Sequence, residues 1–395
     1  MFKIITALFF MAFLLIPFAD QRILATLPVY PLDIVFGAIL IISLSVFWQK
    51  KEVLAKKNSV ILIMLTFFFV STFVSWGINN PTLTGLGQIK SWILLPALTL
   101  FLTAAVFATN KKRDHTLLMA WAGGILFLLA IMLPYVLSGI RTFDGRLQGP
   151  FTSPNFLAVY LFPSCVLGWY FFKQVRTSFE KSVIFCIVLF AVLTLFLTQS
   201  LGCILALVVS IFWFAFRCLH GKTLWRRGAI IGAAVVLFVI FTFIQNEKIS
   251  SLFDERSSLT SRITIWQVAG KALQDNPVVG IGIGNFQSVY LSYQPIYPPY
   301  LEWAVPQPHN VWLAIWLQSG IMGIVVMLFF LYKITTTSRT SEKTNEARIV
   351  LESLCVGLLA YGLFDTPLFG NALAVIWWGV LAFLLFPVLE KEEKP

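Results

Sequence analysis

One histidine in this sequence stands where imidazole chemistry is possible. His115 and His220 lie in short segments rich in lysine and arginine, whereas His309 directly precedes an apolar stretch that we expect to form a helix. The positive end of a helix dipole disfavours imidazolium, so it helps to keep the neutral ring that a general base requires, and it attracts anions such as phosphates. The alternative is that His309 only forms hydrogen bonds at the start of the helix.

Arg262 and Trp266 are spaced to act together. They are four residues apart in the segment SRITIW, so they lie on the same face of a helix. A guanidinium fork matches the oxygens of a phosphate, and a neighbouring indole offers a plane for stacking. The pair therefore indicates an anion-binding or substrate-binding site. An interfacial anchor is the competing interpretation, because tryptophan and arginine are common at membrane surfaces.

Further polar residues gather in the segment GRLQGPFTSPN (residues 145–155) and just before it. They are Arg141, Arg146, Gln148 and Asn155. Arginines in a region that is otherwise poor in positive charge suggest a binding role. Snorkelling of the long side chains to a membrane surface is the commoner explanation.

Asp365 is an acid near the end of a long apolar block. Ionisable residues inside membrane segments are costly, so each is a functional candidate by default, although a helix cap is the alternative. Two other features are weaker indications of a functional site. The run Gly280, Gly282, Gly284 lacks the flanking strand and helix of a dinucleotide site, and the aromatic run from Tyr290 to Trp303 fits sugar stacking or an interfacial belt.

The elements that position these residues are apolar blocks. Of 395 residues, 58% are hydrophobic and 12% are charged, against about 25% charged in ordinary soluble domains. A helix needs roughly 20 apolar residues to cross the hydrocarbon of a bilayer. The blocks predict an all-α polytopic membrane protein with about twelve transmembrane helices, and eleven or thirteen stay possible because the pair around Gln199 could form one broken element. We place them near 3–19, 32–48, 59–77, 91–109, 116–138, 154–172, 182–198, 201–219, 229–245, 309–332, 349–366 and 371–388.

The formal net charge of +11 follows the connections between these blocks. Lysine and arginine cluster in alternate short loops, around residues 50–57, 111–113, 173–181, 217–227 and 333–348. Under the positive-inside rule this asymmetry predicts that both termini face the cytoplasm. The basic charge is thus explained by topology and contact with membrane lipids, and it calls for no nucleic acid. Five cysteines without a C-x-x-C pair suggest no metal site.

The predicted domain organisation is a single membrane domain, residues 1–395, whose transmembrane helices fall in residues 1–245 and 309–388. One long connection, residues 246–308, lies on the extracytoplasmic side. Connections of this length are uncommon and usually functional. Apolar residues spaced three and four apart after Ser261 predict a short amphipathic helix there, ended by Asp275, Asn276 and Pro277.

Three segments of this chain, in this order, resemble motifs of the O-antigen ligase and O-antigen polymerase superfamily of membrane glycosyltransferases. The first is GPFTSPNFLAVY, residues 149–160. The second is RITIW, residues 262–266, continuing through DNPVVGIGIGNF, residues 275–286. The third is HNVWL, residues 309–313, followed by GIMG, residues 320–323. The length and predicted topology of the whole chain are also similar to those of the family.

The resemblance implies a GT-C-like fold and an inverting glycosyltransferase that needs no metal and no cofactor. The donor would be a glycan on undecaprenyl diphosphate, and the acceptor a lipid-linked glycan, lipid A–core or similar, at the outer leaflet of a bacterial inner membrane. By family match, Arg262 would bind the diphosphate and His309 would orient or activate the acceptor hydroxyl. Trp266, Asn155, Gln148, Asn310 and Asp365 become candidates for substrate binding.

The sequence departs from the family at one place. Where the family commonly has Ser-Arg-Gly, this chain has Ser200, Leu201 and Gly202, and leucine cannot contact phosphate. We therefore expect another cation to supply the second half of a diphosphate clamp. Arg146 is the first candidate, ahead of Arg141 and Arg256.

Other functions fit parts of the pattern. A polymerase that extends carrier-linked repeats shares these motifs with a ligase. A flippase or other transporter is also multi-span and basic, but transporters tend to carry charged sites near the bilayer midplane and repeated halves, neither of which is visible here. A scaffolding subunit of an export complex is a third possibility. Covalent product formed without nucleotide or ion gradient separates the enzyme from a transporter.

Overall fold

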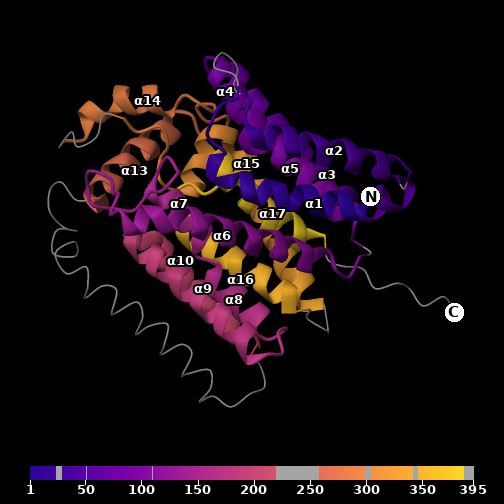
Figure 1. The fold of residues 1–395 in the computed structure, drawn as a ribbon. Helices are drawn as coiled ribbons and strands as arrows, with labels where there is room; N and C mark the ends of the chain where they lie inside the picture. Colours follow the sequence, from indigo (N-terminus) through magenta and orange to yellow (C-terminus); the bar gives the residue numbers. More distant parts are fainter. Residues whose placement is uncertain are drawn as a thin grey trace.

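The computed structural model describes residues 1–23, 29–49, 51–108, 110–218, 258–298, 304–340 and 346–386, and all regular structure in these ranges is helical. The elements are α1 (Phe2–Leu15), η1 (Ile16–Phe18), α2 (Pro31–Gln49), α3 (Lys51–Ile78), α4 (Leu83–Gln88), η2 (Ile89–Leu94), α5 (Leu95–Val106), α6 (Arg113–Leu137), α7 (Pro154–Leu161), α8 (Ser164–Phe172), α9 (Ser178–Leu197), α10 (Leu201–Cys218), α13 (Ser258–Asp275), α14 (Phe286–Tyr293), η4 (Gln294–Ile296), α15 (Val311–Thr340), α16 (Glu346–Tyr361) and α17 (Asn371–Leu385). Figure 1 shows them as a bundle with α13 and α14 at one end.

Eight helical segments among the described residues are long and apolar enough to cross a membrane. Two of them, Leu83–Val106 and Pro154–Phe172, are composite and contain a π-helical turn at η2 or a break between α7 and α8. Phe2–Phe18 and Asn371–Leu385 are shorter apolar helices. The predicted block at 229–245 lies outside the described residues, so the count of about twelve stays a prediction. Around Gln199, which has a φ of 51°, the chain forms two helices.

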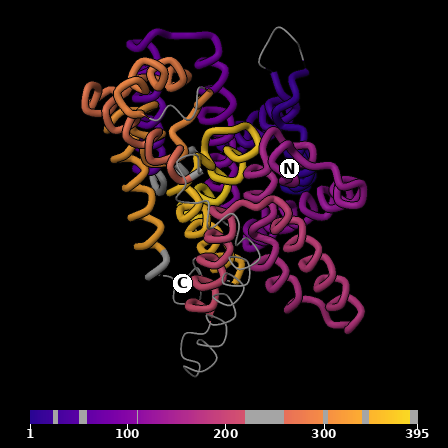
Figure 2. The backbone as a smooth tube through the Cα atoms, turned by 90° about the vertical axis from the view of Figure 1, so that its left-hand side faces the viewer, coloured from indigo at the N-terminus to yellow at the C-terminus, as the bar shows by residue number. Residues whose placement is uncertain are grey.

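The centre of the bundle is α17, whose residues are all buried (Figure 2, yellow). It packs against α5, α15 and α16. Trp378 anchors it: the indole meets the rings of Phe68 and Phe101 edge-on at centroid distances of 5.5 and 6.1 Å, and its Nε1 donates to the carbonyl of Trp92, 2.8 Å away. Burial of such large aromatic side chains accounts for a central helix without a polar face.

At the end of the bundle where α17 finishes, charges are buried. Arg113 and Asp114 pair at 2.7 Å, and Arg113 also donates to the carbonyls of Ala104 and Phe383 at 2.8 and 3.1 Å. Arg348 donates to the carbonyl of Leu384 at 3.1 Å. The sequence predicts that Arg113 and Arg348 lie in short basic loops. That prediction was wrong, because both residues lie in the first turn of a helix, α6 or α16, and are buried. Their side chains satisfy the last carbonyls of α5 and α17, which have no partner within their own helices.

We expect Asp114→Asn to destabilise the fold by about 3–5 kcal/mol, because it leaves the buried Arg113 without its counter-charge. The matched control is Glu346→Gln, since the pair of Lys173 and Glu346 is about half exposed at 2.8 Å and should contribute about 0–1 kcal/mol. Thermal unfolding of the detergent-solubilised protein measures both. Equal melting temperatures for the two variants would contradict the prediction.

A break in α15 joins this helix to the segment that follows α13. Gly320 has φ 66° and ψ −171°, which are not helical values. The amide of Ile321 therefore donates to the carbonyl of Val278, 3.0 Å away, and not to the helical acceptor, the carbonyl of Leu317. The released carbonyl of Leu317 accepts from the amides of Ile281 and Gly282, at 2.7 and 3.2 Å. This exchange of backbone hydrogen bonds fixes the end of α13 against α15, and so fixes the residues of the two elements relative to each other.

Gly320→Ala should disrupt this joint. An added Cβ would lie 2.3 Å from the carbonyl oxygen of Val278, in a backbone conformation that side chains rarely adopt, so we expect a loss of at least about 1–3 kcal/mol. Gly270→Ala on α13 is the control, because none of the described residues beyond its chain neighbours and the nearby backbone of its own helix comes within 4 Å of the place that its Cβ would take. It should be neutral or slightly stabilising. Thermal unfolding that shows the same loss for both variants would refute the role of the joint.

Candidate active site

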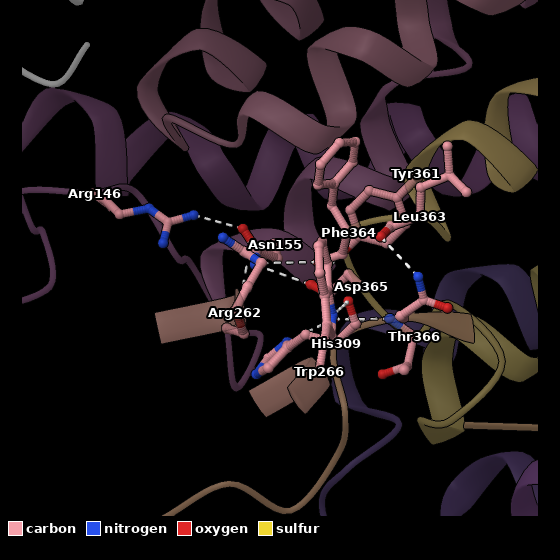
Figure 3. Close-up of polar contacts among 12 residues, drawn as sticks. Arg146, Asn155, Arg262, Trp266, His309, Tyr361, Leu363, Phe364, Asp365 and Thr366 are labelled. Carbon is pink, nitrogen blue, oxygen red and sulfur yellow. Dashed lines mark hydrogen bonds and ion pairs between the residues drawn. The ribbon is translucent and has the colours of Figure 1, made fainter. Parts of the chain in front are cut away.

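Four parts of the chain that are distant in sequence meet at the end of the bundle that carries α13 (Figure 3). They are α13 itself, the residues just before α15, the connection between α16 and α17, and the start of α7 with the loop before it. Each contributes at least one of the residues that the sequence singled out. The charge pattern of the sequence predicts that this end faces the extracytoplasmic side of the bilayer.

Asp365 is the centre of the site. It follows α16, and its side chain is only 8% exposed. Its Oδ1 lies 3.1 Å from His309 Nδ1 and accepts from the amide of Thr366 at 2.9 Å. Its Oδ2 accepts from the Tyr361 hydroxyl at 2.6 Å and from Asn155 Nδ2 at 3.1 Å. A buried carboxylate with this many donors is a well-satisfied anion rather than an unpaired charge.

The contact with Asp365 fixes which ring nitrogen of His309 faces the carboxylate as a donor. An ionised carboxylate can only accept, so Nδ1 of His309 carries the proton and donates it toward Oδ1. The neutral ring then has its lone pair on Nε2. The His309 side chain is 35% exposed, so it is held from within and remains accessible. This is the arrangement of a general base oriented by a carboxylate.

Asn155 links this pair to an arginine. Its Oδ1 accepts from Arg146 Nη2 at 2.6 Å while its Nδ2 donates to Asp365. The Arg146 Nε donates to the carbonyl of Thr198 at 2.7 Å, at the turn between α9 and α10. The guanidinium is therefore held by a residue three positions before Leu201, next to the place where the family commonly has its arginine.

Arg262 and Trp266 reach the site from one face of α13, as their spacing predicts. Arg262 Nε donates to the carbonyl of Phe364 at 3.0 Å, and Trp266 Nε1 donates to the carbonyl of His309 at 3.3 Å. The rings of Trp266 and Phe364 lie 6.3 Å apart. Helix α13 thus binds one backbone carbonyl next to Asp365 and the carbonyl of His309 itself. It also brings a second guanidinium to the site (Figure 3).

The charges of the site influence one another. Burial alone raises the pKa of Asp365, but the hydrogen bonds from His309 and from the Tyr361 hydroxyl, together with the charge of Arg262, hold this pKa below the ordinary value. The carboxylate therefore stays ionised through the neutral range. Burial lowers the pKa of Arg146, as does the nearby charge of Arg262, while Asp144 raises it. Arginine remains charged under such a shift, so two mutually repelling cations lie beside one carboxylate, which favours an anionic ligand.

Other predicted residues have local contacts. Arg141 donates to the carbonyls of Tyr135 and Ile140 at 3.3 and 2.9 Å, and Gln148 donates to that of Phe151 at 2.6 Å. Asn310 caps α15: its Oδ1 accepts from the amides of Trp312 and Leu313, and its Nδ2 donates to Leu363. Arg256 lies outside the described residues, as do Tyr300 and Trp303.

Sequence reasoning missed the hydroxyl of Tyr361 and the carbonyls of Thr198 and Phe364. Tyr361 had a usable signal, because it stands four residues before Asp365 and so on the same helical face. The two carbonyls had none, since any residue type supplies one. Within the described residues, no three histidine, cysteine, aspartate or glutamate side chains are arranged to hold a metal ion.

Comparison with known proteins shows which family the sequence resembles. A family model described as O-antigen ligase matches residues 186–328, which include Arg262, Trp266 and His309. The O-antigen ligase of Salmonella typhimurium (strain LT2) is 28% identical over 202 residues, which are 47% of this chain and 47% of that protein. Both matches support the O-antigen ligase superfamily. The matched part of this chain spans about half the length of that relative. Asn155, Arg146 and Asp365 lie outside the region of the family model, and geometry alone joins them to its residues.

Proposed function

We propose that the protein is a membrane glycosyltransferase of the O-antigen ligase type. It would move a glycan from undecaprenyl diphosphate to a lipid-linked acceptor, lipid A–core or a similar surface lipid, at the outer leaflet of the bacterial inner membrane. One observation carries the proposal: His309 and Asp365 form an oriented base, and Asn155 joins them to Arg146 beside Arg262. Base and cations are the two requirements for transfer from a diphosphate.

In the proposed reaction an acceptor hydroxyl attacks the anomeric carbon of the glycan. Nε2 of His309 accepts the hydroxyl proton, the new glycosidic bond forms, and the bond from the anomeric carbon to the diphosphate oxygen breaks. The electron pair leaves with the diphosphate, whose growing negative charge is stabilised by Arg146 and Arg262. Attack opposite the leaving group inverts the anomeric configuration, as the family resemblance implies.

Asp365 has a positioning role in this scheme. It holds the Nδ1 proton and stabilises the imidazolium that forms when Nε2 takes a proton. Its pKa lies below the ordinary value, so it stays ionised and takes up no proton in this scheme. Trp266 offers an aromatic surface next to His309, suited to a sugar ring of the donor or acceptor.

The test is transfer by the purified protein in lipid nanodiscs, with a labelled carrier-linked glycan and no nucleotide or ion gradient. Lipid A–core and a second carrier-linked repeat are offered as separate acceptors, and products are identified by mass spectrometry. Covalent product on lipid A–core that disappears with His309→Ala supports the ligase. Product only on the carrier-linked repeat would show a polymerase. Glycan movement across proteoliposomes without any covalent product would contradict the proposal in favour of a transporter.

A further inference from the structure

Apolar side chains are exposed along α6 and beyond its end. Leu126, Leu133 and Leu137 share one exposed face of the helix, and Leu137 is 78% exposed. The exposure continues in the loop that follows, where Ile140 is 56% exposed and Phe143 is completely exposed. Large apolar groups displayed in a row are costly in water and favourable in lipid. The exposed face of α6 therefore continues past the helix end toward the candidate active site.

The loop that carries Phe143 is held in one conformation. The amide of Thr142 donates to the carbonyl of Arg146 at 2.9 Å, the amide of Gly145 donates to that of Thr142 at 2.9 Å, and the Thr142 hydroxyl accepts from the amide of Arg146 at 3.0 Å. The amide of Leu147 donates to the carbonyl of Leu197 at 2.8 Å. Phe143 is thus displayed at the tip of a fixed turn, and Arg146 is fixed at the base of the same turn.

A second apolar face reaches this loop from the neighbouring helix. Helix α9 packs against α6, and Phe185, Leu189 and Leu193 are 63%, 47% and 51% exposed along one of its sides. The helix ends at Leu197, whose carbonyl holds the loop. The loop accordingly joins an apolar surface of two helices to a guanidinium that contacts Asn155 in the site. That sequence of chemistries matches a long hydrocarbon chain that ends in an anionic head.

We propose that the loop of residues 137–146 is the binding surface for the isoprenoid chain of the lipid-linked donor. Phe143 and Ile140 contact isoprene units, while Arg146 holds the diphosphate at the head of the same molecule. The donor carries two phosphates where a phospholipid carries one, so two guanidinium groups close enough to repel each other, Arg146 and Arg262, favour this occupant over bulk phospholipid. The inference rests on the proposed donor and adds the route by which its lipid part reaches the site.

The first experiment is photo-crosslinking, which needs no turnover. Undecaprenyl diphosphate with a photoreactive isoprene unit is added to the protein in nanodiscs, and the labelled peptide is identified by mass spectrometry. We expect label in residues 137–146, displaced by unlabelled undecaprenyl diphosphate and not by phosphatidylglycerol. Label elsewhere, or displacement by phosphatidylglycerol as well, would overturn the proposal.

The second experiment compares donors in the transfer assay. Phe143→Ser should raise the KM for the undecaprenyl-linked donor about tenfold, with kcat unchanged, because it removes one aromatic contact with the chain. The KM for the same glycan on methyl diphosphate should not change, and Phe143→Leu should behave as wild type. Phe179→Ser is the matched control, since Phe179 is 77% exposed at the opposite end of α9.

The outcomes separate this inference from the proposed function. An unchanged KM for the undecaprenyl donor in Phe143→Ser, or the same loss with both donors, would show that the loop contacts only bulk lipid or supports the fold. A wild-type protein that binds the photoreactive carrier in residues 137–146 but transfers no glycan would refute the proposed function and leave the lipid surface standing.

Discussion

Replacing His309 with alanine is expected to lower the turnover of glycan transfer by about 10²–10⁴-fold, the usual contribution of a positioned general base. The KM for the donor should change little, because the arginines that bind the diphosphate remain in place. Transfer from the labelled carrier-linked glycan measures both constants. Turnover within a factor of about three of wild type would eliminate His309 as the base.

Asp365→Asn should cause a loss of similar size for a different reason. An asparagine offers one acceptor oxygen where the carboxylate offers two, so it cannot satisfy His309, Tyr361, Asn155 and the amide of Thr366 together. The ring of His309 then loses its fixed tautomer. Because the two residues act as a unit, the double variant should be no slower than His309→Ala alone.

The pH profile separates chemistry from folding. The pKa of Asp365 lies below that of an ordinary carboxyl. Its ionised form, and the stability that this form contributes, is therefore lost only when the pH falls below the ordinary carboxyl range. Mildly acidic pH should therefore leave Asp365 ionised, so any fall in wild-type activity there should not come from the loss of this carboxylate. Asp275→Asn, which changes an exposed acid at the end of α13, should keep the wild-type profile.

The second large effect is expected at the two arginines. Arg262→Ala and Arg146→Ala should each lower turnover about 10²–10³-fold, as the loss of a preorganised group that stabilises transition-state charge does elsewhere. Arg146→Lys should recover only part, because a lysine cannot bond to the Thr198 carbonyl and to Asn155 Oδ1 in the same fork geometry. Full activity in both Arg146 variants would dismiss this cation.

Leu201 provides a rescue. It lies three residues after Thr198, whose carbonyl holds Arg146, so the double variant Arg146→Ala with Leu201→Arg returns a guanidinium to the same turn. We expect it to regain at least part of the lost turnover. Arg141→Ala should lower turnover less than Arg146→Ala does, because the contacts of Arg141 are with the end of α6 and its own loop. Lys271→Ala on the exposed side of α13 controls for a general loss of positive charge.

The sequence by itself determined the features that depend on neighbours along the chain. Apolar blocks of membrane length predicted helices, and each of those blocks within the described residues is helical over most of its length. The spacing of Arg262 and Trp266 predicted a shared face, and Asp275, Asn276 and Pro277 predicted where α13 ends. These predictions succeed because helical periodicity and helix termination are local properties of the backbone.

The tertiary structure alone decided which polar groups meet. Asp365 lies 56 residues from His309 and 210 from Asn155, so no periodicity relates them. The contacts exist only because the connection between α16 and α17 lies against the residues before α15 and the start of α7. Arg113 and Arg348 looked like loop residues and instead satisfy helix-end carbonyls inside the bundle. Packing of whole helices decides such pairings, because a buried polar group must find a partner wherever the fold places it.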